Sequence, residues 1–246
     1  MILNSASEAR ILGQEVAAHI HSGKIQYASA VLGAYLDHKN AFRLLDLIGG
    51  ALDDCPTAHL DPFLEAVARS QTMSGWIVIA SALRVHPSCT LEGKLTKCRA
   101  FIIQADVWYA CDSFGERVPG PFLLTDFQKT VHLLSPWRED QNAWVRRSVG
   151  VAVHFWAKRT KGLEEHLDHA KILLDFLKPM LAEKDYQAAK GVGWGLKTLG
   201  RYYPAVAYQW LCQVLLIEKY RPLGVIKRKA LTYLPAEMQR ALSRRS

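Results

Sequence analysis

The sequence lacks the features that mark several classes of protein. Its five cysteines are odd in number, widely spaced and include no C-x-x-C pair, which argues against a disulfide framework, a zinc site and an iron–sulfur cluster. No charged segment followed by an apolar one opens the chain, and no apolar run approaches the roughly 20 residues that span a bilayer. We therefore expect a cytoplasmic protein with no metal, no cofactor and no membrane partner.

Signals for β-strands are also almost absent, and helical periodicity dominates instead. No alternation of period two is sustained, and no Asn-Gly or Asp-Gly turn separates β-branched runs. Within residues 9–20, Leu12, Val16 and Ile20 recur at steps of four, as one face of a helix requires. The same test predicts helices over residues 28–35, 42–52, 63–68, 76–83, 122–134, 144–156, 172–177, 188–202, 206–216 and 225–234, and a run from residue 98 that ends near 113.

Short breaks separate these helices, most of them at a proline, so neighbouring helices should be antiparallel. Helix pairs of roughly 40 residues are the scale of HEAT and armadillo units. We predict an all-α fold, an α-solenoid of HEAT-like repeats with a concave DNA-binding face, forming one domain over residues 1–246. The repeats are degenerate in sequence, which leaves an irregular helical domain as an alternative.

The net charge of +8 is concentrated in the second half of the chain. Residues 137–246 hold 20 Lys and Arg against 10 Asp and Glu, whereas residues 1–136 hold 11 against 13. If the protein binds a polyanion, the contact should centre on the C-terminal half. The alternative is that these charges only solvate helix surfaces.

One candidate for chemistry is the segment of residues 106–113. Trp108 and Asp112 are four residues apart, so on a helix they share one face. Asp112 is expected near the end of the helix that begins around Cys98, where a negative charge gains nothing from the helix dipole. A core tryptophan beside a capping aspartate is the structural alternative.

Two further candidates lie in the basic half. In residues 137–147, Asn142 can cap a helix on which Trp144 and Arg147 share a side, while Arg146 points about 100° away. Later, one helical stripe carries an indole and three cations, which suits a phosphate backbone better than a core. The stripe consists of Lys190, Trp194, Lys197 and Arg201.

Three ordered motifs, VWYACDS, QNAWVRR and KGVGWGLKTLGRYYP, resemble those of the AlkD-type DNA alkylation-repair glycosylases, a HEAT-like repeat family. The resemblance covers roughly residues 70–235. Val107 replaces the first tryptophan of the family's pair, residues 162–169 look like an insertion, and residues 1–70 do not show the family's usual N-terminal pattern.

The resemblance implies the roles of individual residues. It makes Asp112 the catalytic aspartate, Trp108 and Trp194 the cleft tryptophans, Arg147 the cleft arginine and Lys197 a backbone contact. The expected DNA-binding residues are Arg147, Lys190, Lys197, Arg201, Arg146 and Trp144.

The implied activity is that of a monofunctional glycosylase that removes cationic N3- or N7-alkylpurines from double-stranded DNA without flipping the base. We expect a monomer associated with the nucleoid. Three alternatives remain: a self-resistance glycosylase for bulky minor-groove adducts, a non-catalytic DNA-binding module, and a HEAT scaffold without a nucleic-acid role.

Overall fold

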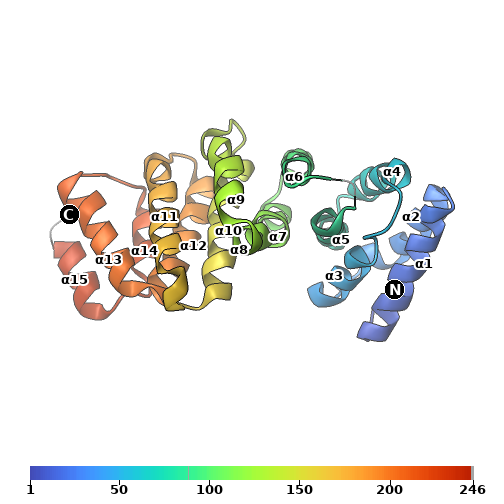
Figure 1. Cartoon of the computed structure of the whole chain (residues 1–246), viewed down its shortest axis with the longest axis horizontal. Coiled ribbons are helices and arrows are strands. Elements are labelled where there is room, and N and C mark those ends of the chain that lie inside the picture. The colour runs from blue at the N-terminus through green and yellow to red at the C-terminus, as the bar shows by residue number, and fades with distance from the viewer. Residues whose placement is uncertain (88, 245–246) are drawn as a thin grey trace. The chain divides into compact units, whose positions relative to one another are not determined.

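The computed structural model describes residues 1–87 and 89–244, and every regular element within those ranges is helical (Figure 1). The all-α prediction is therefore confirmed. The chain forms two compact units, Met1–Val118 and Pro119–Ser246. The single repeat domain over residues 1–246 and its concave face stay predictions. Among the described residues, no helix combines the length and the apolar character that a membrane span needs.

The first unit stacks helix pairs in two layers. In one layer α1, α3, α5 and α7 contact each other in succession, and in the other α2 contacts α4 and α4 contacts α6. This succession is the arrangement of a helical repeat. The helices are α1 (Ala6–His21), α2 (Ile25–Leu36), α3 (Phe42–Gly50), α4 (Thr57–Ala68), α5 (Met73–Val85), α6 (Leu91–Ala105) and α7 (Trp108–Arg117).

Apolar packing and one polar link hold α7 in this unit. The Phe114 ring lies 6.1 Å from Trp76 and 6.2 Å from Phe101, between centroids, and all three rings are buried. Arg117, at the end of α7, donates from Nε to the Asp46 carboxylate of α3 at 2.6 Å. Two partly buried charges paired this closely fix the end of α7 against the middle of α3.

The second unit repeats the layered arrangement. Its α8, α10, α12 and α14 contact each other in succession, while α11 contacts α13 and α13 contacts α15. The α-helices are α8 (Pro119–Thr125), α9 (Phe127–Leu134), α10 (Ala143–Thr160), α11 (Leu167–Leu177), α12 (Tyr186–Tyr202), α13 (Pro204–Cys212), α14 (Gly224–Leu231) and α15 (Ala236–Arg244). Short 3-10 helices span Ser135–Glu139, Glu164–His166 and Lys178–Ala182, and a π-helical turn spans Gln213–Ile217.

Glycines bring α10 and α12 into backbone contact. A Cβ on Gly150 would overlap the carbonyl of Gly191, and a Cβ on Gly191 would overlap the carbonyl of Arg147. Gly195 lies against the carbonyl of Gly150, at 2.9 Å from the position a Cβ would occupy. Only residues without a Cβ permit this approach, which places the side chains of the two helices on one shared surface.

The prediction of one helix from Cys98 to Ser113 is wrong. The helix α6 ends at Ala105, and Asp106 adopts a left-handed conformation with a φ of 47°. Val107 is extended, and Trp108 opens the separate helix α7. Asp112 thus lies in the middle of α7 rather than near a helix end, although it remains one turn from Trp108. The helix ends because Asp106 adopts the αL conformation. Aspartate tolerates this conformation, so the break occurs without the glycine that usually marks it in a sequence.

The region around residues 118–134 also differs from the prediction. The expected helix over residues 122–134 is two helices, because Asp126 at φ −144° separates α8 from α9. The break expected over residues 118–121 is only one residue long, Val118, because α8 begins at Pro119. Proline suits the first position of a helix, where its missing N–H has no intrahelical partner.

Candidate nucleic-acid interface

The start of α10 is shaped by Asn142, as the sequence predicts. Its Oδ1 accepts hydrogen bonds from the backbone N–H groups of Trp144, at 2.9 Å, and Val145, at 3.2 Å. These are two of the donors that a helix N-terminus leaves without an intrahelical partner. The cap fixes where α10 begins and therefore the directions in which Arg146 and Arg147 leave it.

The two adjacent arginines have different surroundings. Arg146 donates to both carboxylate oxygens of Glu183, at 2.6 and 3.2 Å, and this pairing raises the pKa of its guanidinium. It also donates to the carbonyl of Asp140 at 2.6 Å. Its charge is thus balanced by a carboxylate that precedes α12, and Arg146 holds α10 against that segment. A contact from Arg146 to DNA stays a prediction.

Arg147 lies on the face where α10 meets α12. Its side chain is largely buried, with 7% of the residue exposed, and Nη1 donates to the carbonyl of Gln187 at 3.3 Å. Trp144, one turn earlier, is half-buried. Trp144 is therefore partly exposed at the surface of α10, and Arg147 lies where α10 packs against α12.

The basic stripe on α12 is present as predicted, with each cation lying over an aromatic ring. Lys190 Nζ is 5.0 Å from the ring centroid of Tyr186. Lys197 Nζ and the Arg201 guanidinium lie 4.8 and 5.1 Å from the ring centroid of Tyr233. Rings hold these long side chains near the surface without neutralising their charge, so the charge remains available to an anion.

Trp194, at the centre of the stripe, stacks on His154 of α10. The ring centroids are 4.1 Å apart at an interplanar angle of 26°. His154 Nδ1 lies 2.7 Å from Thr198 Oγ1, and that hydroxyl also donates to the carbonyl of Trp194 at 3.0 Å. Burial first, and then Lys158, Lys197 and Lys229, lowers the pKa of His154 to about 4. The imidazole under the indole is therefore neutral at pH 7.

Sequence reasoning missed Lys229 of α14, which joins the same cluster. Burial lowers its pKa, and so do the nearby charges of Lys197, Arg147, Lys190 and Arg228. Its side chain fills the space beside Gly193, where a Cβ would lie 2.8 Å from Lys229 Cδ. With Arg201 of the stripe, six cations from three helices are thus concentrated on one face, against their mutual repulsion. Such a concentration is the electrostatic signature of a polyanion site.

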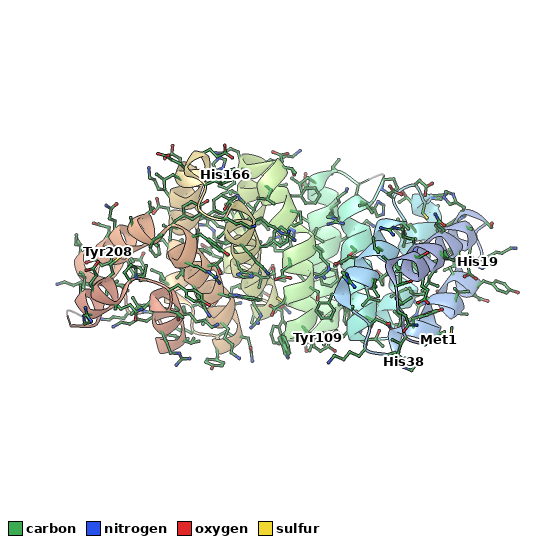
Figure 2. All side chains as sticks on the ribbon, turned by 90° about the horizontal axis from the view of Figure 1, so that it is seen from below. Met1, His19, His38, Tyr109, His166 and Tyr208 are labelled. Carbon is green, nitrogen blue, oxygen red and sulfur yellow. The ribbon has the colours of Figure 1, made fainter. Side chains whose placement is uncertain are left out.

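The first unit presents a different kind of surface on α7. Trp108 is 53% exposed, and its indole meets the ring of Tyr109 edge-on at 5.7 Å between centroids. Tyr109 is labelled in Figure 2. Asp112 is half-buried and lies one helical turn further along. The first unit therefore offers an exposed indole beside a carboxylate on a helix that its core holds firmly.

A family model described as DNA alkylation repair enzyme matches residues 76–234, which is most of the chain. The chain belongs to this family. No curated protein and no solved structure matches it. Membership makes DNA alkylation repair the role of this protein and DNA its substrate.

For a DNA alkylation repair enzyme, the candidate residues divide between the two units. Trp108 and Asp112 lie in the first. The second holds the cationic face, which comprises Arg147, Lys190, Lys197, Arg201, Arg228 and Lys229 around Trp194. The family region begins at Trp76 in α5, so residues 1–75 lie outside it; a divergent N-terminal segment over residues 1–70 stays a prediction.

Proposed function

We propose that this DNA alkylation repair enzyme is a monofunctional DNA glycosylase that hydrolyses the N-glycosidic bond of cationic N3- or N7-alkylpurines. The observation that carries the proposal is the carboxylate of Asp112 one helical turn from the exposed indole of Trp108. In a family that acts on DNA, a carboxylate beside an aromatic surface suits the hydrolysis of a bond to the deoxyribose.

The chemistry requires little acid catalysis at the base. A purine alkylated at N3 or N7 carries a positive charge, so its bond to the deoxyribose is already weakened. What remains is to stabilise the oxocarbenium-like sugar and to direct a water to C1′. The Asp112 carboxylate can do both, because a fixed negative charge stabilises positive charge that develops in the transition state.

The cationic face of the second unit would hold the phosphates of the duplex. Contacts from Lys190, Lys197 and Lys229 to phosphate oxygens add affinity without reading sequence. Arg147 would clamp a phosphate of the duplex through charge-assisted hydrogen bonds. The Trp194 indole, kept in place by neutral His154, would pack against a deoxyribose of the backbone.

An exposed indole also favours recognition of the lesion through the backbone. Enzymes that flip a base need an enclosed pocket for it. Trp108 is more than half exposed and lies on a helix surface, so it suits contact with a deoxyribose that stays in the duplex. Such an open site would accept adducts larger than a methyl group.

Base release from duplex DNA containing 7-methylguanine tests the proposal. The wild-type chain should release 7-methylguanine and leave alkali-labile abasic sites, and Asp112→Asn should lower the rate at least a hundredfold while binding of the duplex is kept. Asp106→Asn is the matched control, because Asn also tolerates the left-handed backbone at that position.

Two results would contradict the proposal. Equal rates for Asp112→Asn and wild type would remove the aspartate from the reaction. Binding without release by the wild type, on 7-methylguanine and on bulky minor-groove adducts alike, would favour a non-catalytic DNA-binding module. Release from bulky adducts alone would favour the self-resistance glycosylase.

A further inference from the structure

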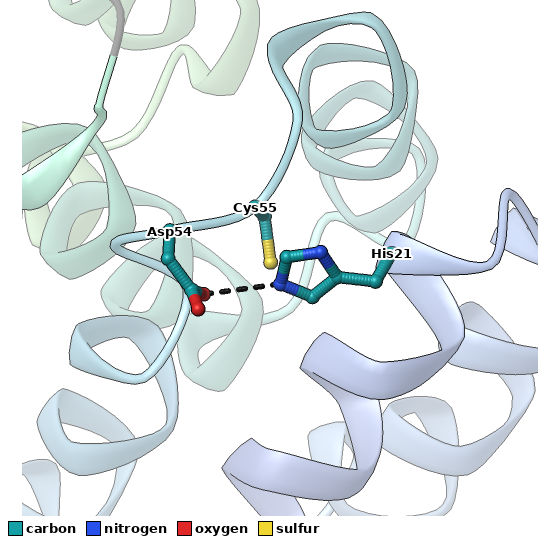
Figure 3. A group of neighbouring side chains, drawn as sticks. All are labelled: His21, Asp54 and Cys55. Atoms are coloured by element: carbon teal, nitrogen blue, oxygen red, sulfur yellow. Dashed lines mark hydrogen bonds and ion pairs between the residues drawn. The ribbon is translucent and has the colours of Figure 1, made fainter.

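Three side chains of the types that can ligate a metal lie together in the N-terminal part of the first unit, outside the family region (Figure 3). His21 is the last residue of α1, and Asp54 and Cys55 lie in the turn between α3 and α4. His21 Nε2 is 3.2 Å from Asp54 Oδ1, and these atoms and Cys55 Sγ all lie within 4.8 Å of one another. A nitrogen, an oxygen and a sulfur donor are thus directed at one point.

An open surface pocket of about 420 Å³ lies beside His21 and Asp54, while the buried Cys55 lies outside its lining. Its walls include His21, Asp54 and also Asp53 and Gln14, with alanines completing the lining. Cys55 is buried, whereas the side chains of His21 and Asp54 are 42% and 73% exposed. The sulfur is thus held by the core, while the other two donors can adjust around it.

The donor set selects the kind of metal. Magnesium and calcium take oxygen ligands almost entirely, whereas a thiolate, an imidazole and a carboxylate are all ligands of zinc. In a tetrahedral zinc site the donors lie about 3–4 Å apart, as follows from metal–ligand distances of about 2.0–2.3 Å. The His21 and Asp54 side chains are exposed, so they are free of the packing that would oppose rotation toward that spacing.

We propose that His21, Asp54 and Cys55 bind a zinc ion, with water as the fourth ligand. The ion would link the end of α1 to the turn between α3 and α4 and so stabilise the first unit. The Asp53 and Asp54 carboxylates both lie near this point and would attract a dication.

The sequence argued against a zinc site because no short pair of ligands is present. Here 33 residues separate His21 from Asp54, and only the packing of α1 against α3 brings them together. The proposed glycosylase chemistry does not use these residues, so a test of the zinc site and a test of the glycosylase activity are independent of each other.

Metal content and thermal unfolding of the tag-free full chain test the site. After treatment with a chelator, reloading with Zn²⁺ and dialysis, the wild type should retain one equivalent of zinc and unfold at a higher temperature than the zinc-free chain. Cobalt loading should produce a thiolate-to-cobalt charge-transfer band and the intense visible bands of a tetrahedral ion.

Four variants separate this site from incidental binding by other His and Cys residues. His21→Ala and Asp54→Asn alter exposed side chains, so they should fold normally, bind zinc at least tenfold more weakly and lose the thermal shift. Cys55→Ala should abolish the thiolate band. His19→Ala, also in the last turn of α1, should retain zinc like wild type. Equal zinc retention and equal thermal shifts in wild type, His21→Ala and Asp54→Asn would overturn the proposal, as would cobalt spectra without a thiolate band.

Discussion

The imidazole of His154 lies under the indole of Trp194, with ring centroids 4.1 Å apart, and so joins α10 to the basic stripe of α12. It is a neutral side chain within a cluster of cations, since Lys158, Lys197 and Lys229 all disfavour its protonation. The stack therefore depends on His154 being neutral, and its protonation can be tested by lowering the pH.

The pH dependence of stability should report this histidine. Its pKa falls from 6.5 to about 4 on folding, so the unfolded chain binds more protons between these values. The stability that this pKa shift gives the folded chain is fully present above about pH 6.5 and is lost as the pH falls toward 4. It amounts to at most about 3 kcal/mol. Urea unfolding at pH 7 and pH 5 should show that His154→Gln loses less stability on acidification than wild type.

The exposed His132 provides the matched control for this measurement. His132→Gln should keep the acid sensitivity of the wild type. If His154→Gln and His132→Gln respond to pH alike, the imidazole under Trp194 is not the group that titrates.

Lys229, which only the tertiary structure revealed, should contribute to DNA affinity through its charge. Lys229→Met should weaken binding to all duplex sequences and reduce the slope of log affinity against log salt by about one, because one fewer counterion is released. Lys171→Met is the control, since that exposed lysine of α11 is paired with Asp168. Binding curves at several salt concentrations measure the slope, and an unchanged slope for Lys229→Met would exclude a phosphate contact.

Trp108 should matter for catalysis and little for folding. Its side chain is 53% exposed, so Trp108→Ala should unfold close to the wild-type temperature. Loss of an indole contact worth on the order of 1 kcal/mol should slow release of 7-methylguanine about five- to tenfold. Tyr27→Ala removes an exposed ring of α2 and should leave the rate unchanged. A wild-type rate for Trp108→Ala would show that the indole does not contact the reacting nucleotide.

The contact between α10 and α12 should tolerate no Cβ. Gly191→Ala would force the new atom into the backbone and the Cγ of Arg147, which should cost about 1–3 kcal/mol and also displace the basic stripe. Gly33→Ala, in α2 with open space around it, should be neutral or stabilising because alanine favours a helix. Thermal unfolding of both variants measures the difference, and equal stabilities would mean that the helices can separate at little cost.

Much of the site could be predicted from spacing because helices place residues three and four apart on one face. This rule anticipated the pairing of Trp108 with Asp112 and the basic stripe on α12, and the cap at Asn142 followed from its residue type. Spacing failed where one residue changes the backbone without glycine or proline, as at Asp106 and Asp126. It could not find Lys229 or His154 either, since both join the stripe from other helices.

The sequence alone is enough to predict that the chain is helical, to which family it belongs and in which half positive charge gathers. These properties are local, because periodicity, composition and ordered motifs act within one stretch of chain. The three-dimensional structure was needed to show that α7 starts at Trp108, that glycines let α10 and α12 touch, and that His21 lies beside Asp54 and Cys55. Those outcomes depend on which surfaces pack together, and packing joins residues that lie tens of positions apart.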